Sequence, residues 1–455
     1  MRFHPAALML MVWLTCVAAF FILPFQLENR VMSLYGYLIL ALFIGTFCLG
    51  AMMAGRPQPQ QPRRPDVAVD FRLADRLLIT AALIAIFASF MDTQGRNLLD
   101  LADAYEARSA TAGALMSGGE SQSSIWFQLA FLTYPAGYVY LVREIAYRPR
   151  PVPWRIGLFG LLPVVMAALA MGGRSPLLYA LIMIIYAFNL RKQLLPKPAP
   201  LRRRAGKAMA QVPGSRLVAR RRPFKLGAPG RAVIIVLGVI MTVYFMQVFL
   251  TRAAISGGVD AMFGVAGQSW GVNFNGPGSN TIYQLFGPEG TYLTFVSFWY
   301  LLQGLVMSNT LFTSYDGPML YGVYGIDLVS ALMRRLNGEF VANGYAHLGA
   351  INVYGFLPSA FGTLYVDLKF LGLLPCLIWG WLAGKAYALV RLGRDPRWVL
   401  AVPFIVMGIL FSIIGTPIGF SNGLITHLWL IAVLVTAQVR IRPSVTAAAR
   451  PRLRA

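Results

Sequence analysis

Two arginines in the sequence stand where a guanidinium could hold a phosphate. Arg174 lies in the turn Gly172-Gly173-Arg174-Ser175-Pro176 between two apolar runs, and Arg252 ends a later apolar run. A guanidinium binds phosphate or carboxylate through two parallel hydrogen bonds and keeps its charge in a partly apolar site. We therefore consider both as candidates for binding a phosphate or carboxylate group. The alternative for each is a side chain that only reaches toward lipid phosphates.

A histidine and an aspartate are the other two residues whose types could do chemistry. His347 lies in a polar stretch before Asn352, and its imidazole could act as general base on a sugar hydroxyl or donate to a phosphate. Asp367 precedes the start of a late apolar run, where a carboxylate is favoured by the helix dipole and could simply cap the helix. The alternative for His347 is an ordinary loop histidine. The sequence shows neither a cluster of metal ligands nor a glycine-rich phosphate loop followed by lysine, so we predict no metal and no cofactor.

The elements that position these residues are membrane helices. Of the 455 residues, 57% are apolar and only 13% are charged, about half the charged fraction of a soluble domain, which is roughly a quarter. Apolar runs close to the ~20 residues needed to cross a bilayer recur throughout. The net charge of +23 would suggest a nucleic-acid partner for a soluble protein. In a membrane protein, the distribution of Lys and Arg among the loops instead indicates how the chain is oriented in the membrane, and we expect no nucleic-acid partner.

Hydropathy predicts an all-α polytopic protein with about ten (10–12) transmembrane helices. Of the 40 Lys and Arg residues, only 8 lie on the outside when both termini are placed in the cytoplasm, and the other 32 lie inside. The first run is interpreted as a retained helix, not a signal peptide. The segment 291–311 is also long enough to span, but its polar residues favour an interfacial or re-entrant helix. The predicted spans are 6–26, 31–54, 75–92, 125–146, 155–171, 175–190, 231–251, 369–390, 399–418 and 424–440.

This topology divides the chain into regions. The inside loop 191–231 is rich in Arg and Pro; we interpret it as a disordered loop that sets topology, and the alternative is a surface for anionic lipid. Long outside loops are usually functional, so we expect the substrate site there. The regions are an N-terminal bundle over 1–190, the basic loop, span 7 at 231–251, a large periplasmic loop with interfacial helices at 252–368, C-terminal spans at 369–440 and a cytoplasmic tail at 441–455.

Several local patterns resemble oligosaccharide repeat-unit (O-antigen) polymerases, within the O-antigen polymerase and ligase superfamily. Asn352-Val-Tyr354-Gly, the acidic helix start from Asp367 to Gly372 and the helix end Gly380-Trp-Leu-Ala-Gly384-Lys-Ala-Tyr387 are similar to that family's segment. The hairpin turn around Arg174 resembles the family's Ser-Arg-Ser hairpin, and Arg252 matches an Arg beyond the next span. The resemblance covers roughly 155–390. Gly355 stands where the family has Thr, and Leu368-Lys369 replaces an aromatic-Gly pair.

The resemblance implies a metal-independent glycosyltransferase with a GT-C-like fold in the bacterial inner membrane. Its donor would be an undecaprenyl-diphosphate-linked oligosaccharide, used at the periplasmic face to build a surface polysaccharide or exopolysaccharide. Arg174 and Arg252 would bind the diphosphate, and His347 or Asp367 would accept the proton. Membrane lipid, a chain-length regulator and a flippase are the further partners. Secondary substrate contacts are expected from Arg108, Arg334, Arg335, Asn352 and Tyr354.

Two other functions remain open on the sequence. An outside histidine followed by an acidic helix start also resembles O-antigen ligases, which transfer the glycan to a lipid or protein acceptor. A transporter or flippase of lipid-linked glycans is the alternative from another class, although the sequence shows no convincing internal repeat and its outside loop is lopsided.

Overall fold

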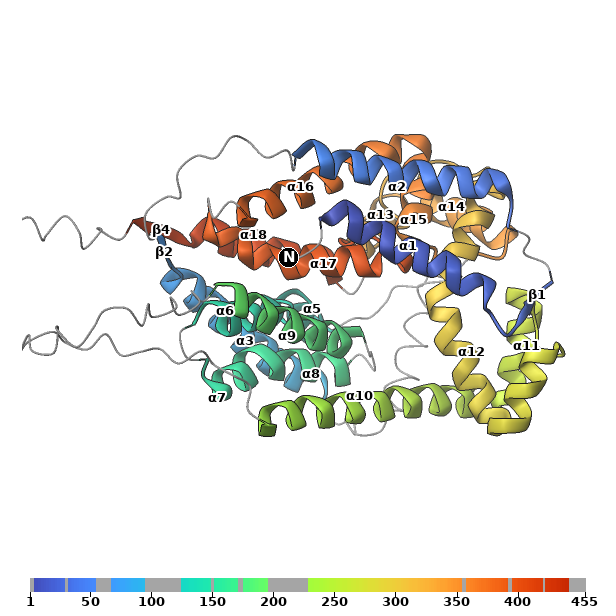
Figure 1. Cartoon of the computed structure of the whole chain (residues 1–455), viewed down its shortest axis with the longest axis horizontal. Helices are drawn as coiled ribbons and strands as arrows, with labels where there is room; N and C mark the ends of the chain where they lie inside the picture. The colour runs from blue at the N-terminus through green and yellow to red at the C-terminus, as the bar shows by residue number, and fades with distance from the viewer. Residues whose placement is uncertain are drawn as a thin grey trace, which may run out of the picture.

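The computed structural model describes most of the chain, and α-helix dominates the part that it describes (Figure 1). The described residues are 4–28, 32–54, 67–94, 124–148, 151–170, 175–194, 228–353, 357–391, 395–419 and 422–441. The candidate residues Arg108, Arg174 and Tyr354 lie outside these ranges, as do most of the basic loop and the tail.

The elements follow in chain order. The first half contains α1 Pro5–Phe21, β1 Gln26–Leu27, α2 Leu34–Ala54, β2 Val67–Asp70, α3 Arg72–Asp92, α5 Ile125–Thr133, α6 Ala136–Tyr147, α7 Pro153–Arg155, the π-helix η1 Ile156–Leu161, α8 Leu162–Ala170 and α9 Ser175–Leu194. The second half contains α10 Ala228–Ile255, α11 Val259–Trp270, β3 Val272–Asn273, α12 Pro277–Ser314, α13 Asp327–Leu336, α14 Gly338–Ala350, α15 Ser359–Leu368, η2 Lys369–Gly372, α16 Leu373–Arg391, η3 Pro396–Ala401, α17 Val402–Leu410, η4 Phe411–Ile413, α18 Gly423–Thr436 and β4 Gln438–Ile441.

The multi-pass membrane architecture predicted from hydropathy is confirmed in its outline. Each of the ten predicted spans overlaps a helix, and seven helices in the described part are long and apolar enough to cross a membrane. The count becomes eight if the bent pair 242–255 and 259–270, which turns by 84°, is one span. Helices α1, α9 and α18 are apolar but shorter.

Two short antiparallel ribbons mark opposite ends of the bundle (Figure 1). At one end β2 pairs with β4, so that Val67 faces Ile441 and Asp70 faces Gln438. At the other end β1 pairs with β3, and α11, α13 and α14 lie nearby. The sequence predicts that the β2–β4 end is cytoplasmic and the β1–β3 end periplasmic. We call these the basic end and the outer end.

Helices α2 and α16 run parallel and pack backbone against backbone. A Cβ atom on Gly380 would lie 2.0 Å from the carbonyl oxygen of Phe47, and one on Gly384 would lie 2.2 Å from that of Ala51. On the other side, a Cβ on Gly50 would lie 2.2 Å from the carbonyl oxygen of Leu377. Small residues allow such close approach in membranes, where helices associate by packing and not by the hydrophobic effect.

Helix α12, which contains the segment 291–311, begins and ends at the outer end. Gly278 near its start lies against the backbone of Pro24, and Asn309 near its end accepts a hydrogen bond from the backbone N–H of Ser33 at 3.0 Å. Both partners belong to the connection between α1 and α2. Length and composition make α12 a candidate span. The helix is broken by a kink at Gly287, which has a positive φ of 68° and precedes Pro288, and the part after the kink runs across the bundle (Figure 1).

Helix α15 starts inside the bundle and runs back to the outer end. Its first residue, Ser359, is fully buried, and its Oγ lies 2.6 Å from the Oγ of Ser308 on α12. Phe361 packs against Trp13 of α1 with ring centroids 5.3 Å apart. After η2 the chain reverses into α16, so α15 and α16 form a helical hairpin. Asp367 thereby comes to the same end of the bundle as the β1–β3 ribbon.

Candidate functional site

A histidine and an aspartate from two different elements meet at the outer end. The Nδ1 atom of His347 on α14 lies 3.2 Å from Oδ1 of Asp316, which follows the end of α12. The His347 side chain is 38% exposed and that of Asp316 is 86% exposed, so the pair is open to solvent. When Nδ1 carries the proton and donates it to the carboxylate, Nε2 is left as an acceptor. This arrangement suits a general base.

Helix α14 is positioned by its N-cap and by a close contact one helical turn before His347. The side chain of Asn337 caps the helix by accepting a hydrogen bond from the backbone N–H of Phe340 at 3.1 Å. Gly344 is packed so closely that a Cβ there would lie 2.3 Å from the side chain of Leu320. Because Leu320 is only four residues after Asp316, this contact fixes α14 beside the segment that carries the carboxylate.

A lysine anchors the residue next to Asp316. The Nζ atom of Lys369 donates to the carbonyl oxygen of Tyr315 at 2.8 Å and lies 3.8 Å from the centroid of the Tyr315 ring. The Tyr315 hydroxyl in turn donates to the carbonyl oxygen of Pro318 at 2.7 Å. A cation held over an aromatic face is stabilised electrostatically, more so when it is partly desolvated. Lys369 therefore fixes the chain that presents Asp316 to the histidine.

Asp367 holds a turn. One carboxylate oxygen accepts from the backbone N–H of Tyr324 at 3.0 Å and the other from that of Gly325 at 2.9 Å, while the carbonyl oxygen of Asp367 accepts from the N–H of Tyr321 at 2.9 Å. The residue is only 4% exposed. Both oxygens are occupied and shielded, so the geometry favours a structural role and leaves His347 as the better candidate for the base.

The neighbouring phenols do not offer an alternative base. Burial raises the pKa of Tyr315 and of Tyr324 above the usual value for a phenol, so both stay protonated at neutral pH. The ring of Tyr324 lies 6.3 Å from that of Tyr345, and the guanidinium of Arg334 lies 5.7 Å from the Tyr345 centroid. Arg334 thus lies at the margin of this region, and its contact with substrate stays a prediction.

The remaining candidate residues are on or just after three different elements, and the structure gives their positions as follows. Arg252 lies in the last turn of α10, which contacts α11 and α12, whereas His347 lies on α14 (Figure 1). Arg335 is exposed in the last turn of α13. Asn352 follows α14 with a positive φ of 55°, and its N–H donates to the carbonyl oxygen of Gly349 at 3.0 Å.

Sequence patterns alone do not single out Asp316 or Lys369 as partners of the site. Asp316 is 31 residues from His347, and no spacing rule connects a residue after one helix with the middle of a helix further along the chain. Comparison with protein-family models, curated proteins and solved structures finds no match. The function is therefore inferred from the site and from the resemblance of the sequence motifs.

Proposed function

We propose that the protein is a membrane glycosyltransferase that polymerises undecaprenyl-diphosphate-linked oligosaccharide repeat units at the periplasmic face of the bacterial inner membrane. The observation that carries the proposal is the solvent-open pair of His347 and Asp316 at the outer end. It supplies a base on the side of the membrane where the sequence predicts a substrate site.

In the proposed reaction, Nε2 of His347 takes the proton from an acceptor hydroxyl as that oxygen attacks the anomeric carbon of the donor sugar. The bond between this carbon and the diphosphate oxygen breaks, and the lipid diphosphate leaves with the electron pair. Asp316 stabilises the imidazolium that forms. Arg174 and Arg252 would hold the leaving diphosphate, whose charge grows in the transition state. The donor itself carries the energy, so no nucleotide is required.

The first test is the surface-polysaccharide profile, resolved on a gel, of cells that lack the protein. The cells are complemented with the wild type, with His347→Ala, with Arg174→Ala or with Glu339→Gln. Glu339 is an exposed residue in the first turn of α14, so its substitution is the matched control on the same helix. We expect His347→Ala and Arg174→Ala to abolish long polymer at wild-type protein levels, and Glu339→Gln to retain it.

The same gel separates the competing functions. Loss of long polymer with single repeat units still attached to the lipid core would support a polymerase. Loss of every attached repeat, with lipid-linked chains accumulating outside, would instead identify a ligase. Intermediates trapped inside would identify a transporter. Normal polymer made with His347→Ala would rule out this histidine as the base.

A further inference from the structure

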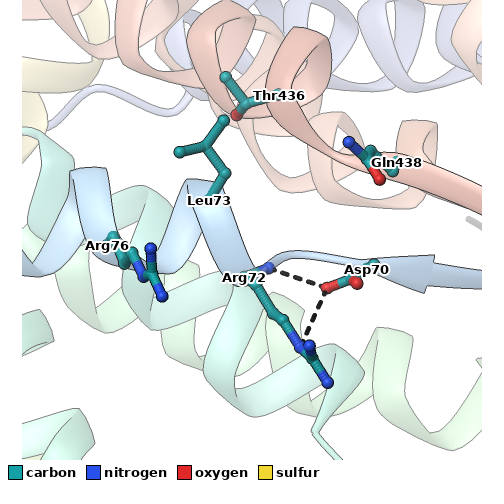
Figure 2. Close-up of a pocket in the computed structure, with 6 residues that line it drawn as sticks. All are labelled: Asp70, Arg72, Leu73, Arg76, Thr436 and Gln438. Carbon is teal, nitrogen blue, oxygen red and sulfur yellow. Dashed lines mark hydrogen bonds and ion pairs between the residues drawn. The ribbon is translucent and has the colours of Figure 1, made fainter.

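A pocket at the basic end lies between the start of α3 and the end of α18 (Figure 2). Its volume is about 250 Å³, slightly below the roughly 300–1,000 Å³ typical of pockets for drug-sized ligands, so it suits one small headgroup. The ribbon formed by β2 and β4 borders it. It is lined by Asp70, Arg72, Leu73, Arg76, Thr436 and Gln438.

The two arginines of the pocket lie one helical turn apart on α3. Residues four apart share one face of a helix, and like charges placed there repel each other. Arg72 is 86% exposed and its Nε is 4.0 Å from the carboxylate of Asp70, a long and weak contact. Among the residues that the structure describes, no ion pair is found for Arg76, which is exposed. An anion between the two guanidiniums would relieve their repulsion.

Other arginines at this end are neutralised within the protein. Arg143 and Arg148 both bond to the carboxylate of Glu144, which is fully buried, at 2.8 Å and 2.6 Å. Arg397 bonds to Asp395 at 2.9 Å. These cations have acidic partners within the protein. Arg72 and Arg76 also line the pocket, and in Figure 2 their side chains extend from α3 on the side away from Thr436 and Gln438.

Apolar side chains continue from the pocket along the two helices. Leu73 is 52% exposed and Leu77 is 39% exposed on α3, and Val435 is 76% exposed on α18. Helix α3 is a candidate span, and α18 is an apolar helix that contacts it. A charged recess above an exposed apolar surface matches a molecule with an anionic head and hydrocarbon chains.

We propose that this pocket binds the headgroup phosphate of an anionic phospholipid. Arg72 and Arg76 bind the phosphate, and the acyl chains lie over Leu73, Leu77 and Val435. The bound lipid bridges the beginning of α3 and the end of α18, which the β2–β4 ribbon already joins. The site is at the opposite end from His347, so it does not depend on the proposed enzymatic function.

The test measures lipid binding to the full-length protein purified in a neutral detergent. Native mass spectrometry follows the retention of added phosphatidylglycerol, with phosphatidylcholine as the zwitterionic probe. We expect the Arg72→Gln/Arg76→Gln variant to bind phosphatidylglycerol roughly 25-fold more weakly than the wild type, and Arg76→Gln alone roughly fivefold more weakly. Phosphatidylcholine should bind weakly to all of them.

The matched control removes two other cations from the same end. Arg155 stacks on Trp154 and Lys385 on Trp381, and neither lines the pocket. Arg155→Gln/Lys385→Gln should therefore keep wild-type retention. An equal loss in both double variants would show a general charge effect and overturn the proposal. So would wild-type binding by Arg76→Gln, equal retention of phosphatidylcholine, or displacement of the lipid by inorganic phosphate.

Discussion

Nδ1 of His347 lies 3.2 Å from Oδ1 of Asp316, and the two residues come from separate elements, α14 and the segment after α12. The carboxylate fixes the orientation of the imidazole and favours the tautomer with a free Nε2. Lys369 holds the neighbouring Tyr315 in place, so three parts of the chain together determine the geometry of a single proton acceptor.

Asp316→Asn should lower the rate of polymerisation without changing how tightly substrate binds. An amide can still contact Nδ1, but it does not stabilise the imidazolium that forms when His347 takes a proton. We expect kcat to fall roughly 10- to 100-fold, less than the ~10²–10⁴-fold available from general base catalysis, with KM unchanged. Initial rates with purified protein and a synthetic lipid-linked repeat unit measure both constants.

Asp316→Glu is the conservative control for this variant, because it retains the charge at a longer reach. It should recover part of kcat. If Asp316→Asn raised KM and left kcat intact, the carboxylate would be a substrate contact and not a partner of the histidine.

Asp367→Asn should destabilise the fold at the outer end. The carboxylate accepts one hydrogen bond on each oxygen, from the N–H groups of Tyr324 and Gly325. An asparagine can accept only one of the two and turns an NH₂ toward the other N–H. Hydrogen bonds to charged groups contribute about 1.5–3 kcal/mol each, so we expect a loss of about 3 kcal/mol. Thermal unfolding in detergent measures it.

Asp260→Asn provides the comparison for Asp367→Asn. Asp260 is an exposed acidic residue in the first turn of α11, and its substitution should lower the unfolding temperature much less. Equal unfolding temperatures for Asp367→Asn and Asp260→Asn would mean that the hydrogen bonds from Tyr324 and Gly325 to the Asp367 carboxylate contribute little to stability.

The spans were predictable because apolar length is a local property of the sequence. The ten predicted segments overlap helices for that reason. The position of α12 was less predictable. The polar residues of the segment 291–311 favour an interfacial or re-entrant helix, and the structure shows that two of them, Ser308 and Asn309, are buried and hydrogen-bonded to Ser359 and to Ser33. Such a placement depends on contacts between segments that are far apart in the sequence, and a hydropathy profile gives no information about those contacts.

The sequence names His347 as a candidate residue, but it does not predict which residue pairs with it. His347 was a candidate because an outside imidazole can move a proton at neutral pH. The partner Asp316, the anchor Lys369 and the turn held by Asp367 all depend on how α14, α15 and the segment after α12 pack. The roles of Arg174, Arg108 and Tyr354 stay predictions, since these residues lie outside the described part of the chain.

Gly380→Ala should disrupt the packing of α16 on α2. The added Cβ would lie 2.0 Å from the carbonyl oxygen of Phe47, and backbone cannot move aside as a flexible side chain can. Overpacking typically costs about 1–3 kcal/mol, and we expect the upper end of that range. Thermal unfolding and the size-exclusion profile in detergent measure the effect.

Gly45→Ala is the matched control for Gly380→Ala. Gly45 is in α2, and a Cβ there meets nothing within 4 Å. This substitution should be neutral or stabilise the helix by up to about 1 kcal/mol, because glycine loses more conformational freedom than alanine. Equal destabilisation by both substitutions would contradict the close approach of α2 and α16.

The sidedness of the protein can be tested by cysteine labelling in spheroplasts. The three native cysteines are buried, so an introduced cysteine dominates the reaction with a membrane-impermeant maleimide. We expect Glu339→Cys at the outer end to be labelled in intact spheroplasts, and Lys385→Cys at the basic end only after lysis. The opposite pattern would invert the topology and move His347 to the cytoplasm.

The glycine contact between α2 and α16 also constrains how the protein is made. Phe43 and Cys376, which touch across this interface, are 333 residues apart in the chain. At about 5–20 residues per second, a ribosome needs roughly 17–67 s to synthesise the intervening polypeptide. For that time the glycine-bearing face of α2 has no α16 to pack against. Nascent chains must therefore keep this face covered with lipid or a membrane chaperone, and a chain truncated before α16 should be a substrate for membrane proteases.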